Sequence, residues 1–478
     1  MDMGNTESTS SRTAENSGSR KHWAWRGGAV CLIFILFAWL PRLKESSSSA
    51  GDGDPTKAAV PTTHPTTDEG RSVGRSHRDN GVASSPQEIV TAKVIQFAKN
   101  RRLVLLAMAK KYKLVVSPEI KAFFDAAERG HWDEINERFA ALWNLKKSTN
   151  APPELRTLWG PILETLGVAE SAHDWPAQRL LDYGNSILDS LRPGMVYVGG
   201  TDPGRFIPTL MNETSDGERH IVLTQNGLAD NSYLDYVRFL YGNDMATLTG
   251  DESQKAFQNY IEDAKKRLEH DQQFPDEAKQ LRPGEDIQIT DGRVQVSGQI
   301  AVMGINELLL QMIMDKNPDM SFALEESFPL HSTYTNASIL GPIMALRVTD
   351  DQSALTPETA AQALDYWRAT SRQVLAETAA DTPEGANVLK TYSKMAASQG
   401  NLFADRNLNT EAEQAYQLGI QICPYNPEAT YGLANVLARE GKVDEARQLV
   451  TEFQQKYPDI AHAQPQPALW TATAALKP

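Results

Sequence analysis

The chain has 478 residues, more than one hydrophobic core usually serves, so we expect two or more domains. Its formal net charge of −14 argues against a nucleic-acid-binding protein, because phosphate backbones are bound by clustered basic surfaces. The two cysteines, Cys31 and Cys423, exclude a disulfide framework and a cysteine-rich metal site. The histidines are scattered without ligand spacing, so no zinc site is predicted.

The N-terminal part of the chain contains one hydrophobic segment. Residues 1–22 are polar and are expected to be disordered, and the hydrophobic segment occupies residues 23–41. Its uncharged core runs from Gly27 to Leu40, which is shorter than the roughly 20 residues that a membrane-spanning helix needs. We interpret it as an uncleaved signal anchor, with a cleaved signal peptide and a buried helix as alternatives. The expectation is a single-pass membrane protein whose bulk is extracytoplasmic, in the periplasm.

A linker and a helical region follow. Residues 42–86 are rich in Ser, Thr, Gly and Pro and are expected to form a flexible linker. The helical region is predicted at residues 87–191. No acidic residue occurs between Glu88 and Glu119, although lysines and arginines are frequent there. Two interpretations stay open: a basic helix that lies on anionic lipids, and a core helix whose charges face solvent.

Residues 192–355 are predicted to form an α/β domain. The apolar run Met195–Val198 and the strand-like segment His220–Asn226 each lead into glycine or polar residues and then into a helical period. Asp291-Gly292, between alternating apolar residues, predicts a β-hairpin. Because strands alternate with helices, we predict a mainly parallel Rossmann-like sheet with an added hairpin.

The C-terminal part shows a repeat. After connecting helices at 356–392, residues 393–460 are predicted to form tetratricopeptide-like α-hairpins, followed by a tail at 461–478. Pro424 and Pro458 recur at the ~34-residue period of such repeats. About three repeats are needed for an independent solenoid, so we expect these hairpins to pack on the rest of the protein. Recruitment of a protein partner is the alternative.

Polar residues follow several predicted strands. In open α/β sheets ligands bind beyond the carboxyl ends of the strands, so we expect these residues to share one rim that holds a sugar, a diphosphate or a divalent ion. The alternative is structural: Asp202 caps a helix, Asn226 closes a turn, and a glutamate pairs with Arg205. The glycines around Asp202 are too loosely spaced for a phosphate loop. The candidate ligand-binding residues are Thr201, Asp202, Arg205, Asn226, Asp230, Glu325 and Glu326.

Several segments, among them Gly199–Phe206, Leu223–Asp230 and Cys423–Ala429, resemble those of uncharacterised bacterial membrane-anchored tetratricopeptide-repeat proteins. The first two are also similar to the soluble domain of a multi-spanning family of unknown function related to protein O-mannosyltransferases. This chain has one hydrophobic segment, so the membrane-embedded transferase half is missing. The resemblance therefore implies neither glycosyl transfer nor any catalytic residue.

Two functions are compatible with these features. In the first, a tethered non-enzymatic protein binds a glycan or polyprenyl-linked ligand through its sheet and a protein partner through its repeats. In the second, the strand ends form the active site of an enzyme that acts on envelope saccharides or phosphate esters. We favour the first, because no nucleophile with its base and no metal-ligand set can be recognised. No cofactor is assigned.

Overall fold

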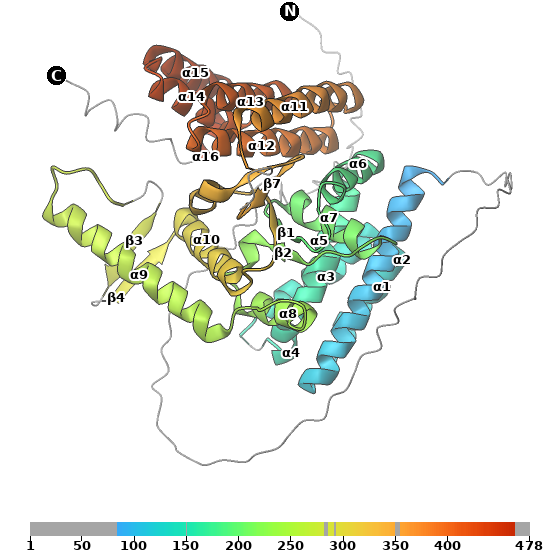
Figure 1. Ribbon diagram of the computed structural model, residues 1–478. Coiled ribbons are helices and arrows are strands. Elements are labelled where there is room, and N and C mark those ends of the chain that lie inside the picture. The colour runs from blue at the N-terminus through green and yellow to red at the C-terminus, as the bar shows by residue number, and fades with distance from the viewer. Residues whose placement is uncertain (1–83, 150, 282–284, 291–292, 349–353, 464–478) are drawn as a thin grey trace, which may run out of the picture. The chain divides into compact units, whose positions relative to one another are not determined.

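The computed structural model describes residues 84–149, 151–281, 285–290, 293–348 and 354–463 (Figure 1). The predicted anchor, nearly all of the predicted linker and most of the predicted tail lie outside these residues. Among the helices that are described, none has both the length and the apolar character needed to cross a membrane.

The fold is mostly helical, so the prediction of a mainly parallel Rossmann-like sheet is wrong. The sheet has five short strands in the order β2-β1-β5-β7-β6. β1 is parallel to β2 and β5, whereas β7 is antiparallel to β5 and β6. The sheet becomes mixed because β6 and β7 are joined by a tight turn at Gly341, whose φ is 56°, and not by a crossover helix. The strands are β1 (Val196–Gly199), β2 (Val222–Thr224), β5 (Phe322–Glu325), β6 (Ser338–Leu340) and β7 (Ile343–Leu346).

The predicted hairpin forms a separate two-stranded sheet. Strand β3 (Asp286–Thr290) pairs antiparallel with β4 (Arg293–Ser297). The hairpin contacts the long polar helix α9 (Gly250–Gln273) and helix α10 (Gln299–Lys316), as Figure 1 shows. It therefore packs against these two helices and adds no strand to the five-stranded sheet.

Helices cover both faces of the sheet because its side chains alternate along each strand. Val196 and Val198 of β1 belong to one hydrophobic cluster, together with residues of α10 and the C-terminal helices. Tyr197, between them, belongs to the other cluster, together with residues of the N-terminal helices. Those N-terminal helices, with the two that follow β1 and β2, are α1 (Pro86–Tyr112), α2 (Pro118–Arg129), α3 (Trp132–Lys147), α4 (Pro153–Thr157), α5 (Trp159–Asp174), α6 (Ala177–Leu188), α7 (Asp202–Glu213) and α8 (Asn231–Tyr241).

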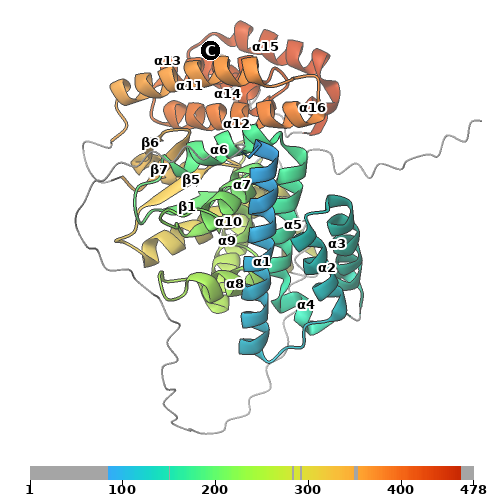
Figure 2. The ribbon, with the colours of Figure 1, turned by 90° about the vertical axis from the view of Figure 1, so that its right-hand side faces the viewer.

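The C-terminal helices pack in succession. Helix α12 packs on α13, α13 on α14, and α14 on α15, while α12 also contacts β7 (Figure 2). The Tyr416 ring lies between two helices, where Cβ atoms added at Gly400 and Gly432 would come within 2.8 and 2.3 Å of it. Small residues at these positions therefore allow the helices to approach. The helices are α11 (Pro357–Glu377), α12 (Pro383–Asp405), α13 (Asn409–Ile422), α14 (Pro427–Arg439), α15 (Val443–Lys456) and α16 (Pro458–Ala463), and two 3₁₀ turns lie earlier in the chain, η1 (Gln225–Gly227) and η2 (His331–Asn336).

Candidate functional site

Two of the predicted strand-end residues, Thr201 and Glu325, are in direct contact. The last residue of β1, Gly199, is in register with Glu325, the last residue of β5. The Oε2 atom of Glu325 accepts hydrogen bonds from the backbone N–H groups of Gly200 at 3.0 Å and Thr201 at 2.8 Å. Its Oε1 atom accepts a third from the Thr201 hydroxyl at 2.9 Å. The Glu325 carboxylate is thus buried and fully engaged within the chain.

This carboxylate lies at the N-terminus of α7, where a helix favours negative charge. The helix is capped by Thr201, whose Oγ1 accepts from the Gly204 N–H at 2.9 Å, so the expected capping role of Asp202 is wrong. A Cβ added at Gly204 would lie 2.0 Å from Oε2 of Glu325, and one at Gly200 would lie 2.4 Å from Oε1 of Gln225. The glycines of this loop therefore permit close packing around an internal carboxylate. That carboxylate occupies the place where a helix N-terminus would otherwise bind an anion.

Asn226 lies on the same rim. Its Nδ2 donates to the carbonyl oxygen of Gly200 at 3.0 Å and to the Ser327 hydroxyl at 3.3 Å. The preceding residue, Gln225, is buried, and its Oε1 accepts from the Ser327 N–H at 3.0 Å. The ends of β1, β2 and β5 therefore meet at one edge, as the sequence predicted from strand order. The side-chain amides of Gln225 and Asn226 connect the loops that follow these three strands.

Asp230 and Arg205 do not join this arrangement, and Asp202 is exposed next to it. Asp230 caps α8, where its Oδ1 accepts from the N–H and the hydroxyl of Ser232 at 2.8 and 2.7 Å. The Arg205 guanidinium lies 4.2 Å from the centre of the Phe206 ring. Among the described contacts it pairs with neither glutamate, so the expected ion pair is not found.

Glu326 points away from Glu325, because successive residues of an extended strand face opposite sides of the sheet. Its Oε2 accepts from the Tyr334 hydroxyl at 2.5 Å, and its Oε1 accepts from Nδ2 of Asn401 at 3.1 Å. Asn401 belongs to α12 and accepts in turn from the Tyr416 hydroxyl at 2.8 Å. No local sequence pattern indicated Tyr416 or Asn401 as a site residue.

The buried carboxylates have raised pKa values. Burial raises the pKa of Glu326 to about 7, although bonds from Tyr334 and Asn401 oppose the shift. Burial also raises the pKa of Glu325 against the hydrogen bonds that favour its charged form. These directions follow from the cost of moving a charge out of water. Both groups are enclosed by the protein, which limits their access to a substrate.

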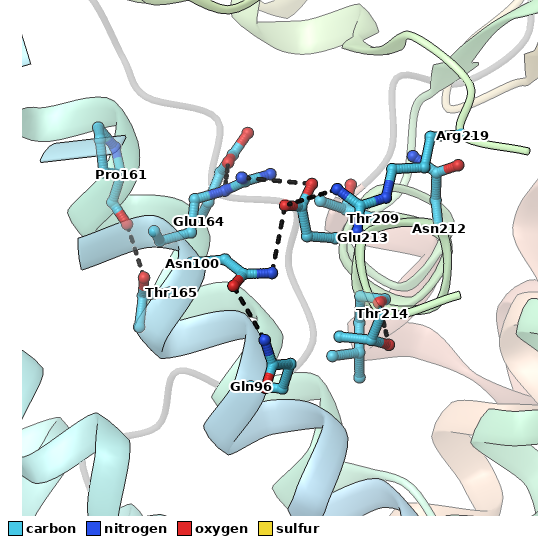
Figure 3. Close-up of polar contacts among 12 residues, drawn as sticks. Gln96, Asn100, Pro161, Glu164, Thr165, Thr209, Asn212, Glu213, Thr214 and Arg219 are labelled. Atoms are coloured by element: carbon cyan, nitrogen blue, oxygen red, sulfur yellow. Dashed lines mark hydrogen bonds and ion pairs between the residues drawn. The ribbon is translucent and has the colours of Figure 1, made fainter. Parts of the chain in front are cut away.

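A second polar cluster, which the sequence analysis missed, joins α1 to α5 and α7 (Figure 3). The Arg101 side chain is buried, and its Nε lies 2.7 Å from Oε2 of Glu164. Its Nη1 lies 3.4 Å from Oε2 of Glu213, whose other oxygen lies 3.8 Å from Nη1 of the exposed Arg219. The Tyr236 hydroxyl donates to Glu164 at 2.7 Å. This network joins four helices, α1, α5, α7 and α8.

Two surface hollows of the described residues lie away from the strand ends. Their volumes are about 430 and 230 Å³, and their linings include Lys316 and His220 respectively but none of the predicted site residues. Within the part of the chain that the structure describes, no group of three or more His, Cys, Asp or Glu side chains is placed to hold a metal ion.

No family model, curated protein or solved structure matches this chain. The resemblance to tetratricopeptide-repeat proteins therefore rests on the sequence segments alone.

Proposed function

We propose that the protein is a membrane-tethered scaffold that binds a protein partner, and that its sheet is a support and not a catalytic site. The observation that carries the proposal is that two adjacent glutamates at the end of β5 bind different parts of the fold. Glu325 binds the loop before α7, while the adjacent Glu326 binds Asn401 in α12. The carboxylates that a catalytic rim would present to a substrate instead join three parts of the fold.

The last helical hairpin, α14 and α15, is the proposed partner-binding part. Its main contacts are with α12, α13 and α16, so its outer surface is not used to hold the sheet. Helix α15 turns Ala446, Val450 and Phe453 inward and leaves a polar face exposed. The repeat spacing supports the same role, because stacked helical hairpins provide extended binding surfaces.

Attachment to the membrane is the second part of the proposal. It is supported by the hydrophobic segment at 23–41 and the linker at 42–86, which would place the folded part outside the cytoplasm on a tether. A glycan or polyprenyl-linked ligand, if the sheet binds one, would contact the exposed Asp202, since Glu325 is already engaged.

The test uses the full chain in its native membranes and a variant, Thr451→Arg/Gln455→Arg, that changes the exposed face of α15. After chemical crosslinking and purification, we expect at least one protein to be crosslinked to the wild type and lost from this variant. The matched control, Gln254→Arg/Gln258→Arg, places the same charges at the same spacing on the exposed face of α9 and should keep the crosslink. A crosslinking pattern that α15 does not influence would contradict the proposal.

The alternative, an enzyme acting on envelope saccharides or phosphate esters, makes a different prediction for Asp202. This residue is the exposed carboxylate of the rim, and Asp202→Asn removes its charge at nearly constant shape. Wild-type hydrolysis of a panel of glycosides and phosphate esters that disappears in Asp202→Asn, at an unchanged melting temperature, would favour the enzyme over the scaffold.

A further inference from the structure

Helix α1 ends in an exposed surface that combines apolar side chains with lysines. Of the seven large hydrophobic side chains that are exposed in the described part of the chain, five lie between Ile89 and Val115. Leu103 is 66% exposed and Val115 is 83% exposed, which are the two largest fractions among them. Apolar residues exposed together in this way are typical of a surface that binds a protein, a ligand or a membrane.

The exposed residues of α1 follow the helical repeat. Lys99, Leu103, Leu106 and Lys110 succeed one another at spacings of three and four, so they lie along one face, and Lys113 follows as the exposed C-cap residue. The opposite face supplies the buried side chains, and it packs on α5 and α2. The interpretation of α1 as a core helix is therefore confirmed, and this helix also carries a basic, apolar outer stripe, while contact with anionic lipids stays a prediction.

The lysines of the outer stripe have no acidic partners among the described residues. Lys93, Arg101 and Arg102 are engaged with Thr214, Glu164 and Asp125 respectively. Lys99, Lys110 and Lys113 form no ion pair with any other residue in the described ranges. Chain reversals at residues 113–117 and 130–131 bring the end of α3 to the same end of the bundle, which adds the exposed Lys147, whereas the half-buried Lys146 packs with its Nζ 4.2 Å from the centre of the Trp159 ring. The acidic residues that α2 presents toward this region are Glu119, which is exposed, and Asp125 and Glu128, which bind Arg102.

We propose that this surface, the basic end of α1, binds the anionic lipids of the membrane to which the chain is tethered. Lysines attract anionic headgroups, each by about 1 kcal/mol near the surface, and the exposed leucines and Val115 enter the boundary with the acyl chains. The exposed leucines select lipid over a second copy of this chain, because a copy with a net charge of −14 would also attract the lysines but offers no acyl phase for the apolar side chains among them. The inference rests on the proposed membrane attachment, which keeps α1 within reach of a bilayer because the proposed linker ends at Pro86, the first residue of α1.

The test measures amide hydrogen exchange in the full chain reconstituted into vesicles of phosphatidylcholine alone or with one third phosphatidylglycerol. We expect the backbone of residues 110–116 to exchange more slowly in the anionic vesicles. The difference should disappear in ~1 M salt, where the Debye length falls to about 3 Å. Flotation with phosphatidylcholine vesicles reports the tether separately, so a failed tether is distinguishable from a failed contact.

Variants separate charge from apolar contact. Lys110→Glu/Lys113→Glu should reduce the lipid-dependent protection by about an order of magnitude or more, and Leu103→Ser/Leu106→Ser should reduce it while leaving the charges in place. The matched control, Lys255→Glu/Lys266→Glu on the exposed face of α9, should retain it. Equal exchange in both vesicle types, or protection that appears only with an added protein, would overturn the proposal.

Discussion

The Glu325 carboxylate lies against Gly204, leaving no space for a side chain at residue 204. A Cβ there would be 2.0 Å from Oε2 of Glu325 and 2.7 Å from Oγ1 of Thr201. We expect Gly204→Ala to lower the free energy of unfolding by about 1–3 kcal/mol, because the carboxylate and the helix cap must both shift. Gly250, the first residue of α9, has open space around it, so Gly250→Ala should leave stability nearly unchanged. Thermal unfolding of both variants checks the contrast, and equal melting temperatures would contradict it.

Removal of the Glu325 carboxylate should lower the free energy of unfolding. Glu325→Ala leaves two backbone N–H groups and the Thr201 hydroxyl without their acceptor, and we expect a loss of about 2–4 kcal/mol. The Thr201→Ala/Glu325→Ala double variant should lose less than the sum of the single variants, because both remove the same contact. Strict additivity in thermal or denaturant unfolding would argue against a shared network.

Glu326 should make stability depend on pH. Burial raises its folded-state pKa to about 7, whereas an unfolded glutamate titrates near 4.3. The folded chain therefore binds a proton more tightly, and this contribution to stability is lost as the pH rises from about 4.5 to 7. Wild type should lose about 2–3 kcal/mol more than Glu326→Gln across this range. Glu262→Gln, on the exposed face of α9, serves as the control and should follow the wild-type profile.

Arg101 and Arg219 offer a comparison between a buried and an exposed cation that face the same carboxylate. The Arg101 side chain is 4% exposed and that of Arg219 is 57% exposed, and both approach Glu213. Arg101→Met should cost about 3–5 kcal/mol, because it leaves Glu164 and Glu213 without their buried partner. Arg219→Met should cost less than about 1 kcal/mol. Similar melting temperatures for the two variants would show that the buried network contributes little.

The sequence predicted local features well. The strands at Met195–Val198 and His220–Asn226, the hairpin around Asp291-Gly292 and the convergence of Thr201, Asn226 and Glu325 follow from apolar runs, turn residues and strand direction. The signals for the strands and the hairpin lie within a few residues of the feature that they predict, whereas the convergence depends on which strands are neighbours.

The remaining features depend on contacts between distant segments. The antiparallel placement of β7 depends on the turn at Gly341, and the link from Glu326 to Asn401 spans much of the C-terminal half. Arg101 looked like one cation among many in a basic helix, since only the fold brings Glu164 and Glu213 to it. Capping by Thr201 rather than Asp202 was a choice between adjacent residues, which helix boundaries read from sequence do not resolve.

Glu325 and Glu326 are joined by a single peptide bond, yet Glu325 holds the loop before α7 and Glu326 holds α12. A force that pulls α12 outward through Asn401 would act on the same short backbone segment that anchors the start of α7. Binding at the repeat region that displaces α12 would thus act on the start of α7 through these two adjacent residues, without any large rearrangement.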